Sequence, residues 1–81
     1  MNVVFSGTMA QPRWKETKKF EDYGINVQNG VRKNTDYLVI GYNPGNSKMS
    51  KAKQYGIKIM EEQEFLDWLA EERPEYFLWM N

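Results

Sequence analysis

Two short segments of the sequence combine residue types that can hold an anion. In the first, Ser6 and Gly7 follow an apolar run, and a hydroxyl beside a glycine lets a backbone amide approach an anion closely. In the second, Lys48 and Lys51 lie at the expected start of a helix, where unpaired amides and charge-assisted hydrogen bonds favour negative charge. The pair predicts a phosphate site whose side chains lie outside the core. Taken singly, the first segment is an ordinary turn and the second a solvated lysine pair.

The composition limits which other chemistry is available. The chain has no cysteine and no histidine, so disulfides, thiolate metal sites and histidine-based catalysis are excluded. Four carboxylates near the C-terminal end, Glu61, Glu62, Glu64 and Asp67, could act as an acid/base pair or bind a divalent metal. The dipole of the helix expected there explains them better. We therefore expect no enzyme activity, no cofactor and no metal.

The formal net charge of zero is the sum of two opposed regions. Residues 11–58 hold ten lysines and arginines against four acidic residues, whereas residues 59–81 hold one against seven. Such a distribution can present a positive face to a phosphate while the other end of the chain stays acidic. The alternative is that both regions are simply solvated surface.

Strand-like and helix-like segments alternate along the chain. Short β-branched and aromatic runs predict strands, and apolar residues at i, i+3 and i+4, such as Phe65, Trp68 and Leu69, predict helices. The expected strands are residues 3–5, 25–27, 37–40 and 57–60. The expected helices are residues 14–23, a second helix that follows the loop 41–47 and runs through residue 55, and residues 61–72.

The order βαββαβα indicates an α/β fold, with a mainly parallel sheet covered by helices on both faces. The loops at the carboxyl ends of parallel strands gather at one edge, so the two anion-holding segments should meet there. We expect one domain over residues 1–72 and an aromatic tail over residues 73–81. The tail either folds back on the core or forms a contact surface.

The ordered pattern of short matches from Val3 to Leu69 resembles the BRCT family, especially the subgroup found in NAD-dependent DNA ligases and the large subunit of clamp loaders. The matching stretches are residues 4–9, 23–24, 31–41, 45–52, 55–59 and 64–66. The resemblance implies a four-stranded parallel sheet flanked by three helices. It also implies a phosphate pocket built from the first loop, the first helix and the start of the second helix.

Carried over by position, the resemblance assigns the phosphate-binding hydroxyl to Ser6, the amide to Gly7 and the two cations to Arg13 and Lys48, with Lys51 assisting. A shift of register in the first helix would replace Arg13 by Lys15. The family usually has two glycines after that helix, whereas here Gly24 is followed by Ile25. Phe65 takes the place of the tryptophan common in the third helix, and Trp68 is expected in the core.

DNA carrying a 5′-phosphate end is the expected partner, in DNA replication or repair, because phosphate contacts dominate DNA affinity and cations recur along the sequence. Expected backbone contacts are Thr8, Lys15, Lys18 and Lys19, with further cations at Arg32, Lys33 and Lys53. The alternatives are a phosphorylated protein, or a replication or repair protein bound without phosphate, as by a scaffold.

The first residues enter an apolar run without a basic region or cleavage site, and no stretch approaches the length of a membrane span. We therefore expect a cytoplasmic protein without a membrane partner, associated with the nucleoid if it is bacterial or from a phage.

Overall fold

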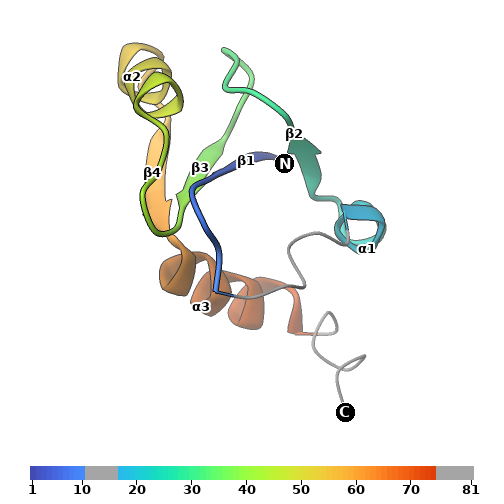
Figure 1. Cartoon of the computed structure of the whole chain (residues 1–81). Coiled ribbons are helices and arrows are strands. Elements are labelled where there is room, and N and C mark those ends of the chain that lie inside the picture. Colours follow the sequence, from blue (N-terminus) through green and yellow to red (C-terminus); the bar gives the residue numbers. More distant parts are fainter. Residues whose placement is uncertain (11–16, 75–81) are drawn as a thin grey trace.

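The secondary-structure elements follow the order predicted from the sequence. The computed structural model describes residues 1–10 and 17–74, and within these ranges it contains four strands and three helices (Figure 1). In chain order they are β1 (Asn2–Ser6), α1 (Thr17–Asp22), β2 (Asn26–Gln28), β3 (Tyr37–Ile40), α2 (Asn46–Gln54), β4 (Lys58–Glu61) and α3 (Glu62–Glu72). The predicted α/β fold is confirmed, and most strand and helix ends differ from the expected ones by a residue or two.

The strands form a parallel sheet in the order β2-β1-β3-β4. Val3 of β1 lies between Val27 of β2 and Tyr37 of β3, and Leu38 of β3 lies beside Ile59 of β4. β1 and β3 are therefore interior strands, which explains why they contain the continuous apolar runs at 3–5 and 37–40. The carboxyl ends of all four strands point to the same edge.

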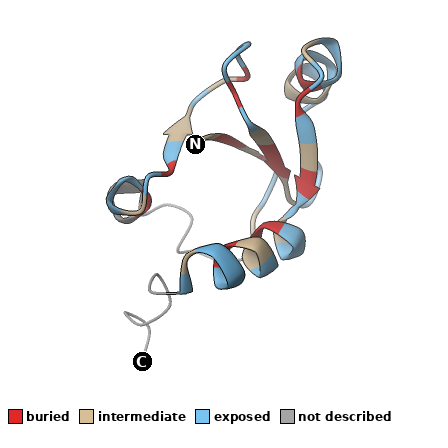
Figure 2. Cartoon of the chain, turned by 180° about the vertical axis from the view of Figure 1, so that it is seen from behind, coloured by how far each residue is buried: buried red, intermediate tan, exposed pale blue. Residues whose placement is uncertain are grey.

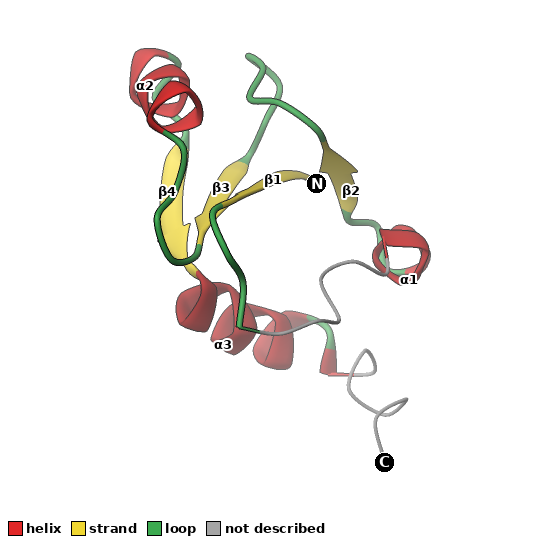
Figure 3. Ribbon diagram, viewed as in Figure 1, coloured by secondary structure: helices red, strands yellow, loops and turns green. Residues whose placement is uncertain are grey.

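Alternate residues of the interior strands build two cores, one on each face of the sheet. Val3 and Val39 pack in a cluster that includes Phe20 of α1 and residues of α3, whereas Val4 and Leu38 pack in a cluster with α2. α1 and α3 thus cover one face and α2 covers the other (Figure 3). Figure 2 shows the buried residues along the inner strands and the inward side of α3. Each fully buried large side chain contributes roughly 1.5–3 kcal/mol to stability.

The turn after α1 needs only one glycine. Gly24 has a φ of +77°, a conformation that L side chains rarely adopt. The amide of Ile25 donates to the carbonyl of Phe20 at 2.9 Å, which closes the helix in the manner of a Schellman motif. Ile25 itself is buried in the core, so the departure from the two-glycine pattern supplies an apolar side chain to the fold.

Phe65 is the centre of the core between α3 and the sheet. Its side chain is fully buried, and its ring contacts Phe5 edge-on at 5.7 Å and Phe20 at 6.3 Å between centroids. Trp68 is partly buried and stacks on Phe65 at 5.8 Å with an interplanar angle of 15°. Both residues therefore have the core positions that the sequence predicts.

The structure describes the expected domain boundary and only the first two residues of the expected tail, 73 and 74. The guanidinium of Arg73 donates to the carbonyl of Tyr23 at 3.2 Å, so the chain just after α3 is still held to the domain. The aromatic residues of the expected tail, 76–79, lie outside the described residues, and the division at residue 72 stays a prediction. Within the described ranges, none of the helices has the length and apolarity needed to cross a bilayer.

Replacing Phe65 by alanine should lower the free energy of unfolding by about 3–5 kcal/mol, because the change leaves a cavity among Phe5, Phe20 and Trp68. Urea denaturation followed by tryptophan fluorescence measures this loss. The matched control is Glu71→Ala, an exposed position on the same helix, for which we expect a change within about 0.5 kcal/mol. Equal effects of the two substitutions would contradict the core position of Phe65.

Candidate phosphate-binding site

The end of β1 is joined directly to the start of α2. The hydroxyl of Ser6 accepts a hydrogen bond of 2.8 Å from the amide of Gly45. The ammonium of Lys48 donates to the carbonyl of Phe5 at 3.0 Å. The structure therefore brings together the two segments that the sequence analysis selects, although they lie about forty residues apart in the chain.

Ser6 differs from the expectation in one respect, because its side chain belongs to the buried part of the protein. The residue is only 5% exposed, and its hydroxyl oxygen is the acceptor that satisfies the Gly45 amide. The expectation that none of the site's side chains lies in the core is wrong for Ser6. A hydroxyl that accepts one hydrogen bond still has its own proton to donate, so the structural contact and an anion contact are compatible.

Gly7 is required by the way the β1 loop approaches the loop after β3. Its φ is +89°, and a Cβ atom at this position would stand 2.6 Å from the carbonyl oxygen of Tyr42. At the neighbouring contact, a Cβ on Gly41 would collide with the carbonyl of Thr8. Gly7 is exposed, so this close packing leaves its backbone at the surface beside Ser6.

A short antiparallel bridge locks the same two loops together. The amide of Thr8 donates to the carbonyl of Tyr42 at 2.8 Å, and the amide of Tyr42 donates back to the carbonyl of Thr8 at 2.9 Å. Thr8 is exposed next to Gly7. The bridge fixes the backbone of both loops before any ligand arrives.

α2 begins at Asn46, inside the segment 41–47 that the sequence predicts to be a loop. Its N-cap is Gly45, and no side chain caps the helix. The reason is tertiary: the Ser6 hydroxyl fixes the Gly45 amide, and the Gly45 carbonyl accepts from Met49 at 3.2 Å. The amides of the first turn of the helix have no partner within it.

The cations expected at the site are distributed over two helices. Lys48 is half-buried at the start of α2, and Lys51 is exposed one turn further along. Lys18 and Lys19 lie on α1. Arg13 and its substitute Lys15 lie outside the described residues, so their assignment to the phosphate rests on the family resemblance.

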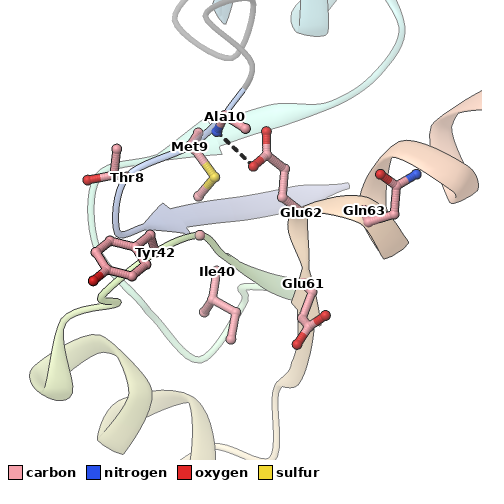
Figure 4. A pocket seen from close by; sticks show the side chains of 9 residues that line it. Thr8, Met9, Ala10, Ile40, Tyr42, Glu61, Glu62 and Gln63 are labelled. Atoms are coloured by element: carbon pink, nitrogen blue, oxygen red, sulfur yellow. Dashed lines mark hydrogen bonds between the residues drawn. The ribbon is translucent and has the colours of Figure 1, made fainter.

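An open hollow of about 520 Å³ lies beside the loop that holds Ser6 and Gly7, at the carboxyl ends of β1, β3 and β4 (Figure 4). It is lined by Thr8, Met9, Ala10, Ile40, Gly41, Tyr42, Glu61, Glu62 and Gln63. Glu62 accepts a hydrogen bond of 2.8 Å from the amide of Ala10, which holds the chain after β1 against α3. In the part of the chain that the structure describes, no group of three or more acidic side chains is placed to hold a metal ion.

Two features of the site were not predicted from the sequence. One is the Ser6–Gly45 hydrogen bond, and the other is the Thr8–Tyr42 bridge that fixes the loop after β1. The sequence feature closest to the Ser6–Gly45 hydrogen bond is the run Asn43, Pro44 and Gly45, which predicts a tight turn after the strand 37–40. Asn43 has a φ of +51°, which asparagine tolerates better than most residues.

Comparison with known proteins agrees with this fold and topology. The sequence model of the BRCA1 C Terminus (BRCT) domain family matches residues 1–69. The chain therefore belongs to the BRCT family.

The relatives found among characterised proteins are DNA ligases. The chain is 36% identical over 69 residues to a DNA ligase of Helicobacter pylori, covering 85% of this chain and 10% of the ligase. It is 42% identical over 76 residues to a DNA ligase of Fervidobacterium nodosum, covering 93% of this chain and 11% of the ligase. A DNA ligase of Aquifex aeolicus is 42% identical over 69 residues, with 84% of this chain and 10% of the ligase covered. The chain thus spans about a tenth of the length of these relatives.

Replacing Ser6 by alanine should lower the free energy of unfolding by about 0.5–1.5 kcal/mol, because the hydrogen bond between the Ser6 hydroxyl and the Gly45 amide is lost. Chemical denaturation gives the loss, and amide hydrogen exchange at Gly45 should accelerate in parallel. Ser50→Ala is the matched control, since Ser50 is exposed on α2 and alanine is the better helix former. If Ser6→Ala is as stable as Ser50→Ala, the Ser6–Gly45 contact has no structural role.

Proposed function

We propose that this chain is a non-catalytic module that binds a phosphate group and recognises DNA ends carrying a 5′-phosphate in DNA replication or repair. The observation that supports the proposal best is the convergence of the Ser6 hydroxyl, the Gly7 backbone and the Lys48 ammonium at the amino end of α2. A hydroxyl, backbone amides and a cation are the groups that hold phosphate oxygens in proteins.

The contacts in the free protein leave donors for such an anion. An ammonium has three N–H donors, and the contact of Lys48 with the Phe5 carbonyl takes one of them. The hydroxyl of Ser6 keeps its proton while its oxygen accepts from Gly45. Because Lys48 and Ser6 are anchored by these contacts, binding does not have to order them, which favours affinity.

Charge and relatives favour DNA over a phosphorylated peptide. Lys51 and Lys53 on α2 are exposed, and cations of this kind hold the DNA backbone away from the end. Arg32 and Lys33 are exposed as well, but they lie in the loop that leads into the amino end of β3, at the edge where Lys58 lies. The relatives in the comparison are named as DNA ligases. If the protein is bacterial or from a phage, a nucleoid location follows from the DNA partner and belongs to the same proposal.

Lys48→Ala should weaken binding of a 5′-phosphorylated duplex about tenfold to a hundredfold, because it removes a charge and a charge-assisted hydrogen bond. Fluorescence anisotropy with a labelled duplex measures the affinity. The matched control is Lys58→Ala, since Lys58 is exposed at the start of β4, at the opposite edge of the sheet. Denaturation curves for both variants separate loss of binding from loss of the Phe5 contact. Equal weakening by the two substitutions would leave only diffuse electrostatic attraction.

Removing the 5′-phosphate from the same duplex should weaken binding of the unaltered chain, and it should change the affinity of Lys48→Ala much less. Affinity should also fall steeply as salt increases, since counterions are released from DNA on binding. Short phosphoserine and phosphothreonine peptides test the alternative partner in the same assay. Preference for such a peptide over phosphorylated DNA would favour the phosphopeptide reading, and indifference to both would favour a scaffold that binds proteins without phosphate.

A further inference from the structure

One wall of the hollow at the carboxyl ends of β1, β3 and β4 is an exposed aromatic side chain. Tyr42 is 76% exposed and is the one large hydrophobic side chain so exposed among the described residues. The amide and the carbonyl of Tyr42 both form hydrogen bonds with Thr8, so the main chain that carries the ring is fixed. An exposed aromatic residue on a fixed backbone loses little conformational freedom when it binds a partner.

The opposite wall of the hollow is acidic. Figure 4 shows Glu61 across from Tyr42, with Ile40 between them. Glu61 is exposed and Glu62 accepts the hydrogen bond from the Ala10 amide, while the described residues that line the hollow include no lysine or arginine. The exposed carboxylate of Glu61 therefore favours a cation over a phosphate at this wall of the hollow, in contrast to the segment at Ser6 and Gly7 next to it.

We propose that the hollow binds an arginine side chain of a protein partner. A guanidinium is planar, stacks on an aromatic face and forms bidentate hydrogen bonds with a carboxylate. Tyr42 supplies the face, Glu61 supplies the carboxylate, and Met9 and Ile40 supply apolar surface for the methylene groups of the stem. Lysine has the charge but not the flat, forked group that matches both walls.

This site goes beyond the proposed function, because it needs no phosphate and takes a ligand of opposite charge. The carboxylate of Glu61 also disfavours DNA at this wall, so a duplex end held at Ser6 and Lys48 is better placed along α2, where Lys51 and Lys53 are exposed. DNA and a protein can then be held at the same edge of the sheet without competing for the same groups.

The test uses the isotope-labelled full chain and a blocked five-residue peptide with one central arginine between small residues. Titration should shift the amide signals of Met9, Tyr42 and Glu61. The control peptide carries citrulline, which has the shape of arginine without its charge, and should bind much more weakly. A lysine peptide should also bind more weakly than the arginine peptide. Citrulline binding equal to arginine binding, or shifts confined to other parts of the chain, would overturn the proposal, and equal binding of lysine would overturn the assignment to arginine.

Variants locate the binding groups. Tyr42→Ala and Glu61→Gln should each weaken the arginine peptide roughly two- to fivefold, whereas Tyr42→Phe should keep the affinity. Glu64→Gln is the matched control, because Glu64 is exposed on α3 and does not line the hollow. Equal effects of Glu61→Gln and Glu64→Gln would overturn the site.

The two proposals fail separately. Lys48→Ala should leave arginine-peptide binding unchanged whether or not it affects DNA binding. If titration with a 5′-phosphorylated duplex shifts the signals of Tyr42 and Glu61 while the arginine peptide shifts none, the hollow belongs to the DNA site and the inference is wrong.

Discussion

The hydrogen bond from the Gly45 amide to the Ser6 hydroxyl stabilises the edge of the sheet at which the candidate site lies. It joins the last residue of β1 to the residue that caps α2, and the contact of Lys48 with the Phe5 carbonyl lies beside it. The start of α2 is thereby placed against the sheet by the side chains of Ser6 and Lys48. The proposed function assigns the phosphate to the same two side chains, so it combines a structural and a binding role in each of them.

The same edge is divided by charge over a short distance. On one side of the Thr8–Tyr42 bridge lie Ser6, Gly7 and the lysines of α2, and on the other lie Glu61 and Glu62. The two proposals accordingly assign an anion to one side of this bridge and a cation to the other. Together they would give a small domain of zero net charge two different binding chemistries.

The sequence predicts the fold well because its signals are local. Continuous apolar runs at 3–5 and 37–40 identify the interior strands, and the stripe of Phe65, Trp68 and Leu69 identifies α3. Parallel topology then follows from the alternation of strands and helices. The two segments of the site could be selected for the same reason. The Gly45 cap, the burial of Ser6 and the Thr8–Tyr42 bridge could not, because each depends on a contact between residues far apart in the chain.

The all-parallel pairing of the sheet bears on how the protein acquires its site during folding. Neighbouring parallel strands cannot be joined by a tight hairpin, so every pair in this sheet forms only after a long loop has closed. Domains dominated by such distant contacts fold more slowly than helical bundles of the same size. The contacts of Ser6 with Gly45 and of Lys48 with Phe5 are among the longest-range in the molecule and require β1, β3 and α2 together. A growing or partly folded chain has the serine and the glycine of the first loop, but it has no site until α2 has docked.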